Sequence, residues 1–441
     1  MSEPLYRPVD ARMSWPAMED AVARRWTDGK ISERSVAERR ELPEWVFYEG
    51  PPTANGKPGI HHAEARIFKD IFCRYQSMRG HYVLRKGGWD CHGLGVEIEA
   101  EKQLGIKEKR DIEEKVGIEQ FIRTCRESVQ RYVDEWERFT DRIAFWIDLD
   151  DAYWTMSPEY IESVWWLLKQ IWDKGLLEED FKVVPYCPRC QTALSSHEQH
   201  QPDAYRRVAD PSVFVRFVLE DEPDTALLVW TTTPWTLLAN LAAAVGPDLT
   251  YVLTDDPDNP GHRLIVAKER LAALFGEGAP VHNEIKGVDL LGRRYVPPYD
   301  FVPASERGHT VLPGDFVSTE EGTGVVHLAP YGEDDIAVAK RDNVPVVQMI
   351  DPAGRVVPEG GEFAGLWFKD ADPKIVADLE QRGVLFRAET YEHSYPHCWR
   401  CATPLLYYAR KDWYIRTSQI RHELQQSNED TNWQPPTIKY G

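Results

Sequence analysis

Apolar positions in the first half of the chain form short runs that end in polar loops, or recur at helical spacing. Residues 45–48 (W-V-F-Y) form one such run, and a loop rich in glycine and proline follows over residues 50–62. Residues 63–76 carry apolar positions three to four apart, as one face of a helix does. The pattern predicts a strand, a loop and a helix that begins directly after His62, a geometry that can hold nucleotide phosphates.

Three further segments of this half have a clear pattern. Residues 118–143 and 158–174 have helical spacing and predict two packed helices with buried apolar faces. The apolar run at residues 82–84 leads into the loop G-W-D-C-H-G-L at residues 88–94. We expect a second strand there, because open α/β sheets place their ligands where strands end in polar loops.

Beyond residue 190 the pattern changes to short apolar runs separated by Asp, Pro and Gly. The runs cover residues 213–218, 227–232, 263–266 and 324–328. Such spacing predicts a β-barrel-like domain rather than more parallel α/β sheet.

Composition limits the class of protein. The 441 residues are enough for two or three domains, and 52 basic against 72 acidic residues give a net charge of −20. This charge by itself argues against a nucleic-acid partner, so any RNA must meet local basic patches. The N-terminus does not resemble a secretory signal and the most apolar stretch is interrupted by polar residues, so we expect a cytoplasmic protein with no membrane span.

Four of the seven cysteines form two C-x-x-C pairs, C-P-R-C at 187–190 and C-W-R-C at 398–401. The two-residue gap lets one knuckle give two thiolates to one zinc, and two knuckles make a closed structural site. His393 and His397 lie near the second pair, so a mixed ligand set stays open. The favoured ligands are Cys187, Cys190, Cys398 and Cys401.

The loop over residues 50–62, G-P-P-T-A-N-G-K-P-G-I-H-H, resembles the ATP-binding signature of class I aminoacyl-tRNA synthetases, normally His-x-Gly-His. Here Gly and His have exchanged the first and third positions. Further matches are F-Y-E-G-P-P-T-A-N-G, G-W-D-C-H-G-L, V-V-P-Y-C-P-R-C and W-T-T-T-P-W-T-L. Together they resemble the N-terminal part of the isoleucyl-tRNA synthetases over essentially the whole chain. The four signature positions are Gly59, Ile60, His61 and His62.

The resemblance implies an α/β fold with a Rossmann-like nucleotide-binding catalytic domain, whose N-terminal half is residues 1–186. A zinc-stapled insertion over residues 187–401 would contain a β-barrel-like editing domain at about 205–390, with a zinc-ribbon junction. Residues 402–441 would return toward the catalytic domain.

The resemblance also implies an activity: activation of isoleucine with ATP and Mg²⁺, then charging of tRNA(Ile), by a monomer. The loop before His62 and the signature itself would bind ATP, with Gly59, His61 and His62 in the catalytic role. Pro51 would line the amino-acid pocket and Asp90 would bind the substrate ammonium group. The alternative for Asp90 is a helix cap or a solvated loop acid.

A second, hydrolytic site is implied by the same resemblance. A pocket for isoleucine rejects valine by only about 1–3 kcal/mol, so editing of valyl-tRNA(Ile) is physically motivated. The implied editing residues are Thr231, Thr232, Thr233, Thr236, His327 and Asp335. The alternative for the four threonines is a strand edge and turn. The alternative for the acid is Asp334, because the spacing between Pro330 and the acid is one residue shorter than usual.

The second signature of class I enzymes, Lys-Met-Ser-Lys-Ser, does not occur in these 441 residues. We therefore expect an incomplete fragment with little aminoacylation, in which editing-type deacylation survives. The rival interpretations are a zinc-stapled tRNA-binding module without catalysis and a stand-alone editing deacylase. We also expect the exchanged signature to weaken the binding of inhibitors that mimic the adenylate, which would give antibiotic resistance. The alternative is that the motif has decayed and lost its function.

Overall fold

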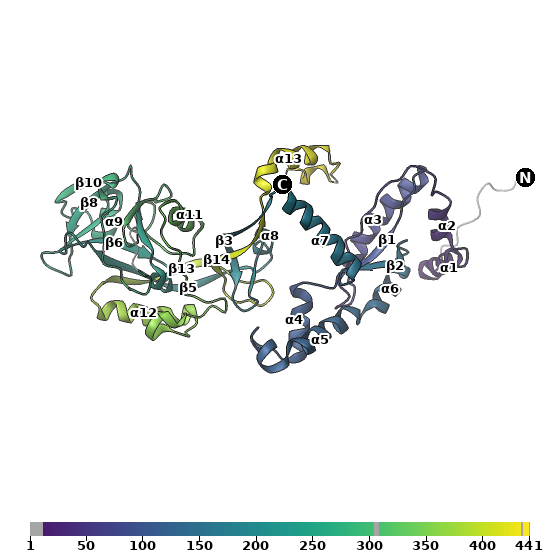
Figure 1. Cartoon of the computed structure of the whole chain (residues 1–441), viewed down its shortest axis with the longest axis horizontal. Coiled ribbons are helices and arrows are strands. Elements are labelled where there is room, and N and C mark those ends of the chain that lie inside the picture. Colours follow the sequence, from purple (N-terminus) through teal and green to yellow (C-terminus); the bar gives the residue numbers. More distant parts are fainter. Residues whose placement is uncertain (1–11, 304–307, 434, 441) are drawn as a thin grey trace, which may run out of the picture. The chain divides into compact units, whose positions relative to one another are not determined.

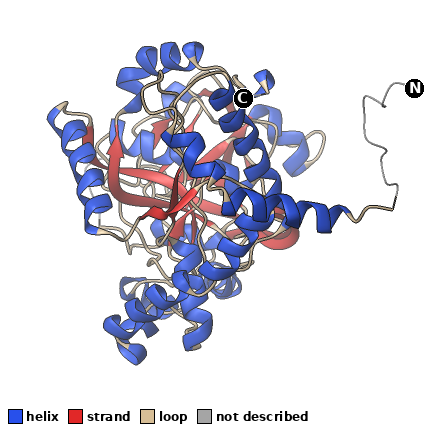
Figure 2. Ribbon diagram, turned by 90° about the vertical axis from the view of Figure 1, so that its right-hand side faces the viewer, coloured by secondary structure: helices blue, strands red, loops and turns tan. Residues whose placement is uncertain are grey.

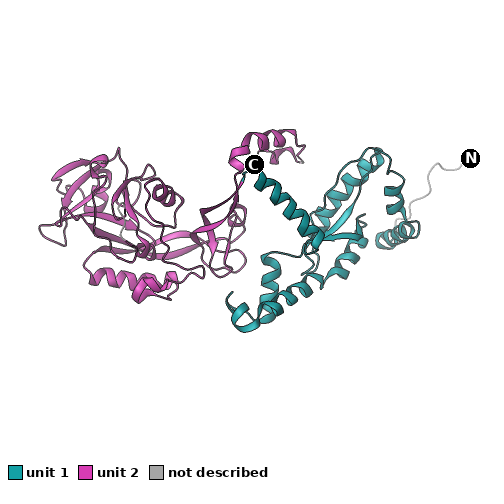
Figure 3. Ribbon diagram, in the orientation of Figure 1, with its two compact units in different colours: residues 1–176 teal, residues 177–441 magenta. Residues whose placement is uncertain are grey.

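The computed structural model describes residues 12–303, 308–433 and 435–440, which contain both helices and strands (Figure 2). The chain divides into two compact units, Met1–Leu176 and Leu177–Gly441 (Figure 3). The first unit is mostly helical and the second is built on sheets (Figure 1). Each unit is described by itself.

The first unit surrounds a short pair of parallel strands, β1 (Lys86–Trp89) and β2 (Asp148–Trp154). Its core contains Trp89, Val96, Val129 and Trp136. Its helices are α1 (Trp15–Asp28), α2 (Ile31–Ala37), α3 (Ile60–Met78), α4 (Leu94–Leu104), α5 (Ile118–Gln130), α6 (Val133–Arg142) and α7 (Pro158–Asp173), with a π-helical turn at Ile112–Val116.

The predicted strand at residues 45–48 is wrong, and the strand expected at residues 82–84 lies a few residues later, as β1 at Lys86–Trp89. One parallel bridge joins Glu44 to Tyr82, and the N–H of Trp45 donates to the carbonyl of Tyr82 at 2.8 Å. The rest of the first run is loop, and Tyr48 is 88% exposed. No strand of the described residues pairs along this run, and an apolar run without a partner strand does not form a ladder.

The two predicted helices of this unit also differ from the pattern. The helix expected over residues 118–143 is two helices, because the N–H of Tyr132 leaves the helical pattern and donates to the carbonyl of Ala54 at 3.2 Å. The helix expected over residues 158–174 is present as α7, where Ser157 caps its start. Its apolar face is not buried, since Trp165 is 69% exposed.

Within its described residues, the second unit contains three sheets. The pairing order of the largest is β10-β8-β9-β6-β5-β13, a smaller sheet is β11-β7-β12, and β14-β3-β4 forms a ribbon. Four of its strands confirm the predicted short runs: β5 (Tyr205–Val218), β6 (Thr225–Thr231), β9 (Arg263–Ala267) and β12 (Val325–Leu328). The others are β3 (Leu177–Cys187), β4 (Thr192–Ala193), β7 (Ala242–Val245), β8 (Thr250–Asp255), β10 (Asn283–Lys286), β11 (Val311–Pro313), β13 (Leu385–Pro396) and β14 (Leu406–Ile415).

The second unit also has helices, and one of them packs on the large sheet. Helix α12 (Phe368–Gln381) lies along β5 and β13 (Figure 1). The remaining helices are α8 (Ser196–Gln199), α9 (Leu271–Phe275), α10 (Gly287–Leu290), α11 (Glu333–Arg341) and α13 (Arg421–Asp430). The main core contains Val215, Phe217 and Leu227 from the large sheet, together with Phe368 and Ile375 from α12.

Candidate functional site

Helix α3 begins at Ile60, three residues earlier than the pattern predicts, so both histidines lie in its first turn. The backbone N–H of Gly59 donates to Nδ1 of His62 at 2.9 Å, and the side chain thereby caps the helix. Nδ1 of His62 therefore accepts a hydrogen bond from the backbone and does not donate one to a ligand. Burial is the main cause that lowers the pKa of His62, so the ring is neutral at pH 7.

The loop before the helix borders a cavity of about 510 Å³. Indole Nε1 of Trp136 donates to the carbonyl of Gly56 at 2.9 Å, and its ring lies 4.7 Å from that of His62. The tryptophan therefore joins the loop to the helix start. The lining includes Gly50, Pro51, Pro52, Thr53, Asn55, Gly56, Lys57, His62 and Lys69.

Three cationic side chains, those of Lys57, Arg66 and Lys69, and the carboxylate of Glu49 border this cavity. The ammonium of Lys69 lies 2.9 Å from Oε1 of Glu49, whose other carboxylate oxygen is buried without a hydrogen-bond partner. The guanidinium of Arg66 lies 4.9 Å from the ring of Trp136. The cavity thus combines a helix start with positive charge, which favours an anionic ligand.

Asp90 and Pro51 lie on segments that touch each other. Pro51 lines the cavity, and the N–H of Asp90 donates to the carbonyl of the next residue, Pro52, at 2.9 Å. Its carboxylate accepts from Thr53 Oγ1 at 3.0 Å and from the N–H of His92 at 3.2 Å. Asp90 is partly exposed, so one carboxylate can both order this turn and face a ligand.

In the second unit, three of the four predicted threonines form one hydrogen-bonded cluster. Thr233 Oγ1 lies 3.2 Å from Thr231 Oγ1 and 3.3 Å from Thr236 Oγ1. Thr236 Oγ1 lies 2.8 Å from Nε2 of His327. The contact arises because β7, which follows the threonines directly, pairs antiparallel with β12, which carries His327.

Behind this cluster lies a residue that sequence reasoning missed. Asn240 is buried, and its side-chain nitrogen lies 3.5 Å from Nδ1 of His327. Tyr295 Oη donates to Asn240 Oδ1 at 2.7 Å. No signal in the sequence distinguishes these two residues, because they meet only through the packing of separate strands and loops.

Asp335 and Asp334 have different surroundings, although both are in the first turn of α11. Oδ2 of Asp335 accepts from the N–H of Ala329 at 3.1 Å, while Asp334 is exposed. Burial raises the pKa of Asp335 to about 7. The geometry therefore favours Asp335 as the acid that faces the end of β12.

The four paired cysteines come together, with their Sγ atoms all within 4.8 Å of one another. Sγ of Cys401 lies 3.5 Å from that of Cys187 and 3.6 Å from that of Cys190. Tetrahedral zinc with Zn–S bonds of about 2.3 Å needs sulfur atoms roughly 3.8 Å apart, so this donor set fits the ion. The nearby histidines have other partners: His393 contacts Asp210, and His397 contacts the carbonyl of Tyr395.

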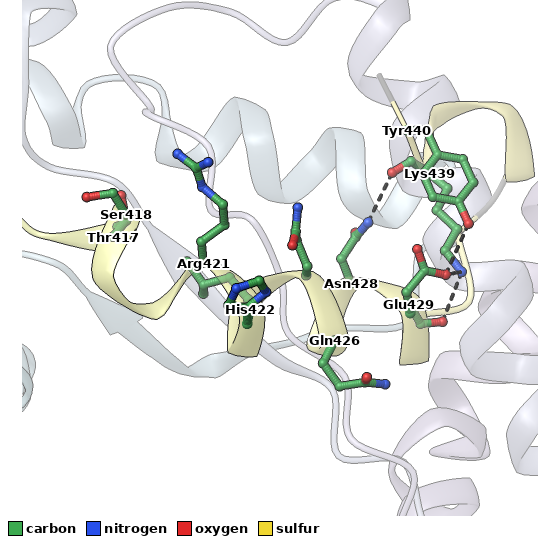
Figure 4. A pocket seen from close by; sticks show the side chains of 11 residues that line it. Thr417, Ser418, Arg421, His422, Gln426, Asn428, Glu429, Lys439 and Tyr440 are labelled. Atoms are coloured by element: carbon green, nitrogen blue, oxygen red, sulfur yellow. Dashed lines mark hydrogen bonds and ion pairs between the residues drawn. The ribbon is translucent and has the colours of Figure 1, made fainter.

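A wider groove, of about 1110 Å³, runs along α13 (Figure 4). Polar side chains such as Arg421, His422 and Lys439 border it, and none of the predicted site residues does. In the described parts of the chain, no helix combines the length and the apolar character that a bilayer crossing requires.

Comparison with known proteins places these features in one family. The chain is 50% identical to an isoleucine–tRNA ligase of Streptomyces coelicolor over 446 residues, covering 100% of this chain and 42% of that protein. It is 48% identical to an isoleucine–tRNA ligase of Thermus thermophilus over 435 residues, covering 97% of this chain and 41% of that protein. The chain thus spans about two fifths of these relatives. The family model described as tRNA synthetases class I (I, L, M and V) matches residues 21–440, and the chain belongs to this family.

Proposed function

We propose that this chain is part of an isoleucine–tRNA ligase and supplies the ATP side of its activation site. The main observation that supports this proposal is the start of α3, where the capped turn at Gly59 lies beside the cavity of about 510 Å³. ATP, with Mg²⁺, would place phosphates near the free N–H groups of this turn. Because the relatives are named isoleucine–tRNA ligases, we infer that isoleucine and tRNA(Ile) would be the other substrates.

The chemistry is in-line displacement at the α-phosphate, so positioning and charge stabilisation dominate. We assign ATP binding to the loop ending in Gly59, Ile60, His61 and His62. Lys69 and Arg66 add positive charge at the wall of the same cavity. Pro51 would contact the amino-acid side chain, and Asp90 would pair with the substrate ammonium in a charge-assisted hydrogen bond.

Isoleucine-dependent ATP–pyrophosphate exchange tests this assignment, measured on the 441-residue chain and on a longer protein that contains it. We expect ATP binding by both and efficient exchange by the longer protein alone. Full exchange by the shorter chain would show that its own residues complete the site. Absence of ATP binding by both would refute the assignment.

A second activity, hydrolysis of valyl-tRNA(Ile), is favoured by the contact between Thr236 and His327. The two residues are 91 positions apart in the sequence, and the hydroxyl and imidazole lie 2.8 Å apart. Thr232 Oγ1 has no hydrogen-bond partner among the described residues, which leaves it available for a ribose hydroxyl or a water. Asp335 would hold the ammonium of the misattached valine.

Hydrolysis of valyl-tRNA(Ile) by the chain and three variants tests this second site. We expect Thr232→Ala and Asp335→Ala to lose activity, while Asp334→Ala, which changes the exposed neighbouring acid, retains it. Activity that survives in both of the first two variants would refute the site. Binding of tRNA without hydrolysis of valyl-tRNA(Ile) would instead support the non-catalytic tRNA-binding module.

The finer architecture follows from the same proposal. Residues 1–186 would be half of a Rossmann-like domain, and residues 187–401 an insertion whose β-barrel-like editing domain spans about 205–390. Cys187, Cys190, Cys398 and Cys401 would bind one structural Zn²⁺ as a zinc ribbon, close to the start of β14. We place the working protein in the cytoplasm, as a monomer.

A further inference from the structure

A buried line of hydrogen bonds leads from Tyr295 to the threonine cluster. Tyr295 Oη contacts Asn240 Oδ1 at 2.7 Å, and Asn240 Nδ2 contacts His327 Nδ1 at 3.5 Å. His327 Nε2 then contacts Thr236 Oγ1 at 2.8 Å. Tyr295 is fully buried and Asn240 is 1% exposed, so protein groups rather than bulk water decide which atom of each pair carries the proton.

The orientation of the Asn240 amide follows from its second contact. Its Nδ2 lies 3.2 Å from the carbonyl oxygen of Ala242. A carbonyl oxygen only accepts hydrogen bonds, so the atom that faces it must be the NH₂ group. The other amide atom is then Oδ1, and the hydroxyl of Tyr295 must donate to it.

The tautomer of His327 follows from the two contacts of its ring. Nδ1 faces the NH₂ group of Asn240, so it must accept. At the other end, the hydroxyl of Thr236 donates to the carbonyl of Thr233 at 2.7 Å, so its oxygen is free to accept from Nε2–H. The two ends agree independently on one arrangement, in which the proton is on Nε2 and not on Nδ1.

We propose that Tyr295 is a positioning residue that, through Asn240, holds His327 as the Nε2–H tautomer and thereby orients the hydroxyl of Thr236. The main chain of Asn240 is held from another direction, because His309 Nε2 lies 3.2 Å from its carbonyl oxygen. Burial lowers the pKa of His327 to about 4, so its ring is neutral at pH 7. The consequence for hydrolysis rests on the function proposed above, whereas the tautomer does not.

Nitrogen-15 NMR of histidine-labelled chain reads the tautomer directly, since a protonated and an unprotonated ring nitrogen have well-separated shifts. The signals of His327 are identified by their loss in His327→Gln. We expect the wild-type chain to show a protonated Nε2 and an unprotonated Nδ1 at pH 7. A protonated Nδ1 in the wild-type chain would overturn the proposal.

Two variants test the role of the line. Tyr295→Phe removes the donor to Asn240 and should give a mixture of tautomers. Asn240→Asp replaces the NH₂ group by an acceptor and should move the proton to Nδ1. Tyr408→Phe is the matched control, because it removes a partly buried hydroxyl that donates to the Ile350 carbonyl instead.

An unchanged His327 spectrum in both Tyr295→Phe and Asn240→Asp would overturn the proposal, as would the same change in Tyr408→Phe. If Tyr295→Phe does not fold by near-UV circular dichroism, Asn240→Asp alone decides. In valyl-tRNA(Ile) hydrolysis we expect Tyr295→Phe to lose on the order of tenfold, comparable to the loss of an orienting partner at a metal-bound histidine. Absence of hydrolysis in the wild-type chain would refute the editing function and leave the spectroscopic result standing.

Discussion

Gly59 and His61 lie so close at the start of α3 that a side chain at the glycine would collide with the imidazole. A Cβ built on Gly59 would lie 2.9 Å from Cε1 of His61 and 3.1 Å from its Nδ1. A side chain at position 59 can be accommodated only if the exposed ring of His61 moves, so the residues at the two positions affect each other sterically. This relationship makes the two positions a coupled pair.

We predict that Gly59→His alone destabilises the first unit by about 0.5–1.5 kcal/mol, the cost of forcing the exposed His61 side chain off its rotamer, and weakens ATP binding. The double change Gly59→His, His61→Gly removes the obstructing ring and should recover both properties. A double-mutant cycle on the free energy of unfolding, combined with ATP titration, measures the coupling. Additive effects of the two substitutions would contradict the predicted collision.

Pseudomonic acid is a competitive inhibitor of the isoleucyl-tRNA synthetases. The same double change should raise the affinity for this inhibitor in a longer protein that contains this chain. By the resemblance, His61 occupies the position where a glycine would let the backbone approach a nucleotide, and we expect an adenylate mimic to depend on that approach. Inhibition constants of the parent and the swapped protein, compared at equal ATP, provide the measurement. Equal inhibition of both would contradict this explanation, and loss of activity in the parent would favour decay of the motif.

Asp372 predicts a distinct pH dependence of stability. This buried carboxyl accepts from the N–H of Trp235 at 2.8 Å, and burial raises its pKa to about 8. In the unfolded chain this carboxyl ionises near pH 4, so unfolding releases a proton between about pH 4 and pH 8. The contribution of Asp372 to the free energy of unfolding therefore falls as the pH rises through this range. Asp372→Asn keeps the acceptor and should be more stable than wild type at pH 8.5 by a few kcal/mol, since each pKa unit corresponds to about 1.4 kcal/mol.

Urea unfolding of wild type and Asp372→Asn at pH 4.5 and pH 8.5 tests this. The difference in unfolding free energy should be small at the lower pH and large at the higher one. Asp334→Asn is the control, because that carboxyl is exposed. A difference that does not change with pH would show that Asp372 is ionised in the folded chain.

Metal removal provides the fourth prediction. We expect about one zinc per chain by elemental analysis, and a loss of zinc together with lower thermal stability in Cys190→Ser. Cys125→Ser is the matched control, because Cys125 stands apart from the cluster. Retention of full metal content by Cys190→Ser would exclude the four-cysteine site.

Trp136 predicts a local effect at the loop over residues 50–59, to which we assign ATP binding. Trp136→Phe retains an aromatic ring near His62 but removes the donor to the Gly56 carbonyl. Loss of one such bond is worth about 0.5–1.5 kcal/mol, so ATP should bind several-fold more weakly. Trp26→Phe, which changes a ring packed on Trp146 in the same unit, should leave ATP affinity unchanged. Calorimetric titration with ATP compares the two.

The sequence by itself determined the features that depend on local spacing. Strands β5, β6 and β9 of the large sheet follow from short apolar runs. The gathering of four cysteines follows from two C-x-x-C pairs, because two residues between thiols fix a local knuckle. The motifs around Gly59, Thr231 and His327 also predicted the segments to which we assign chemistry. Strand pairing was beyond such reasoning, as residues 45–48 show, because a ladder requires a partner strand elsewhere in the chain.

Only the tertiary structure decided which side chains meet. The pairing of β7 with β12 brings Thr236 to His327, and the packing of a distant loop brings Tyr295 to Asn240. Neither contact has a signature in the sequence, because hydrogen bonds between distant segments depend on how separate strands pack. The proton on Nε2 of His327 follows from those contacts alone, since it is set by the acceptor and donor at each end of the ring.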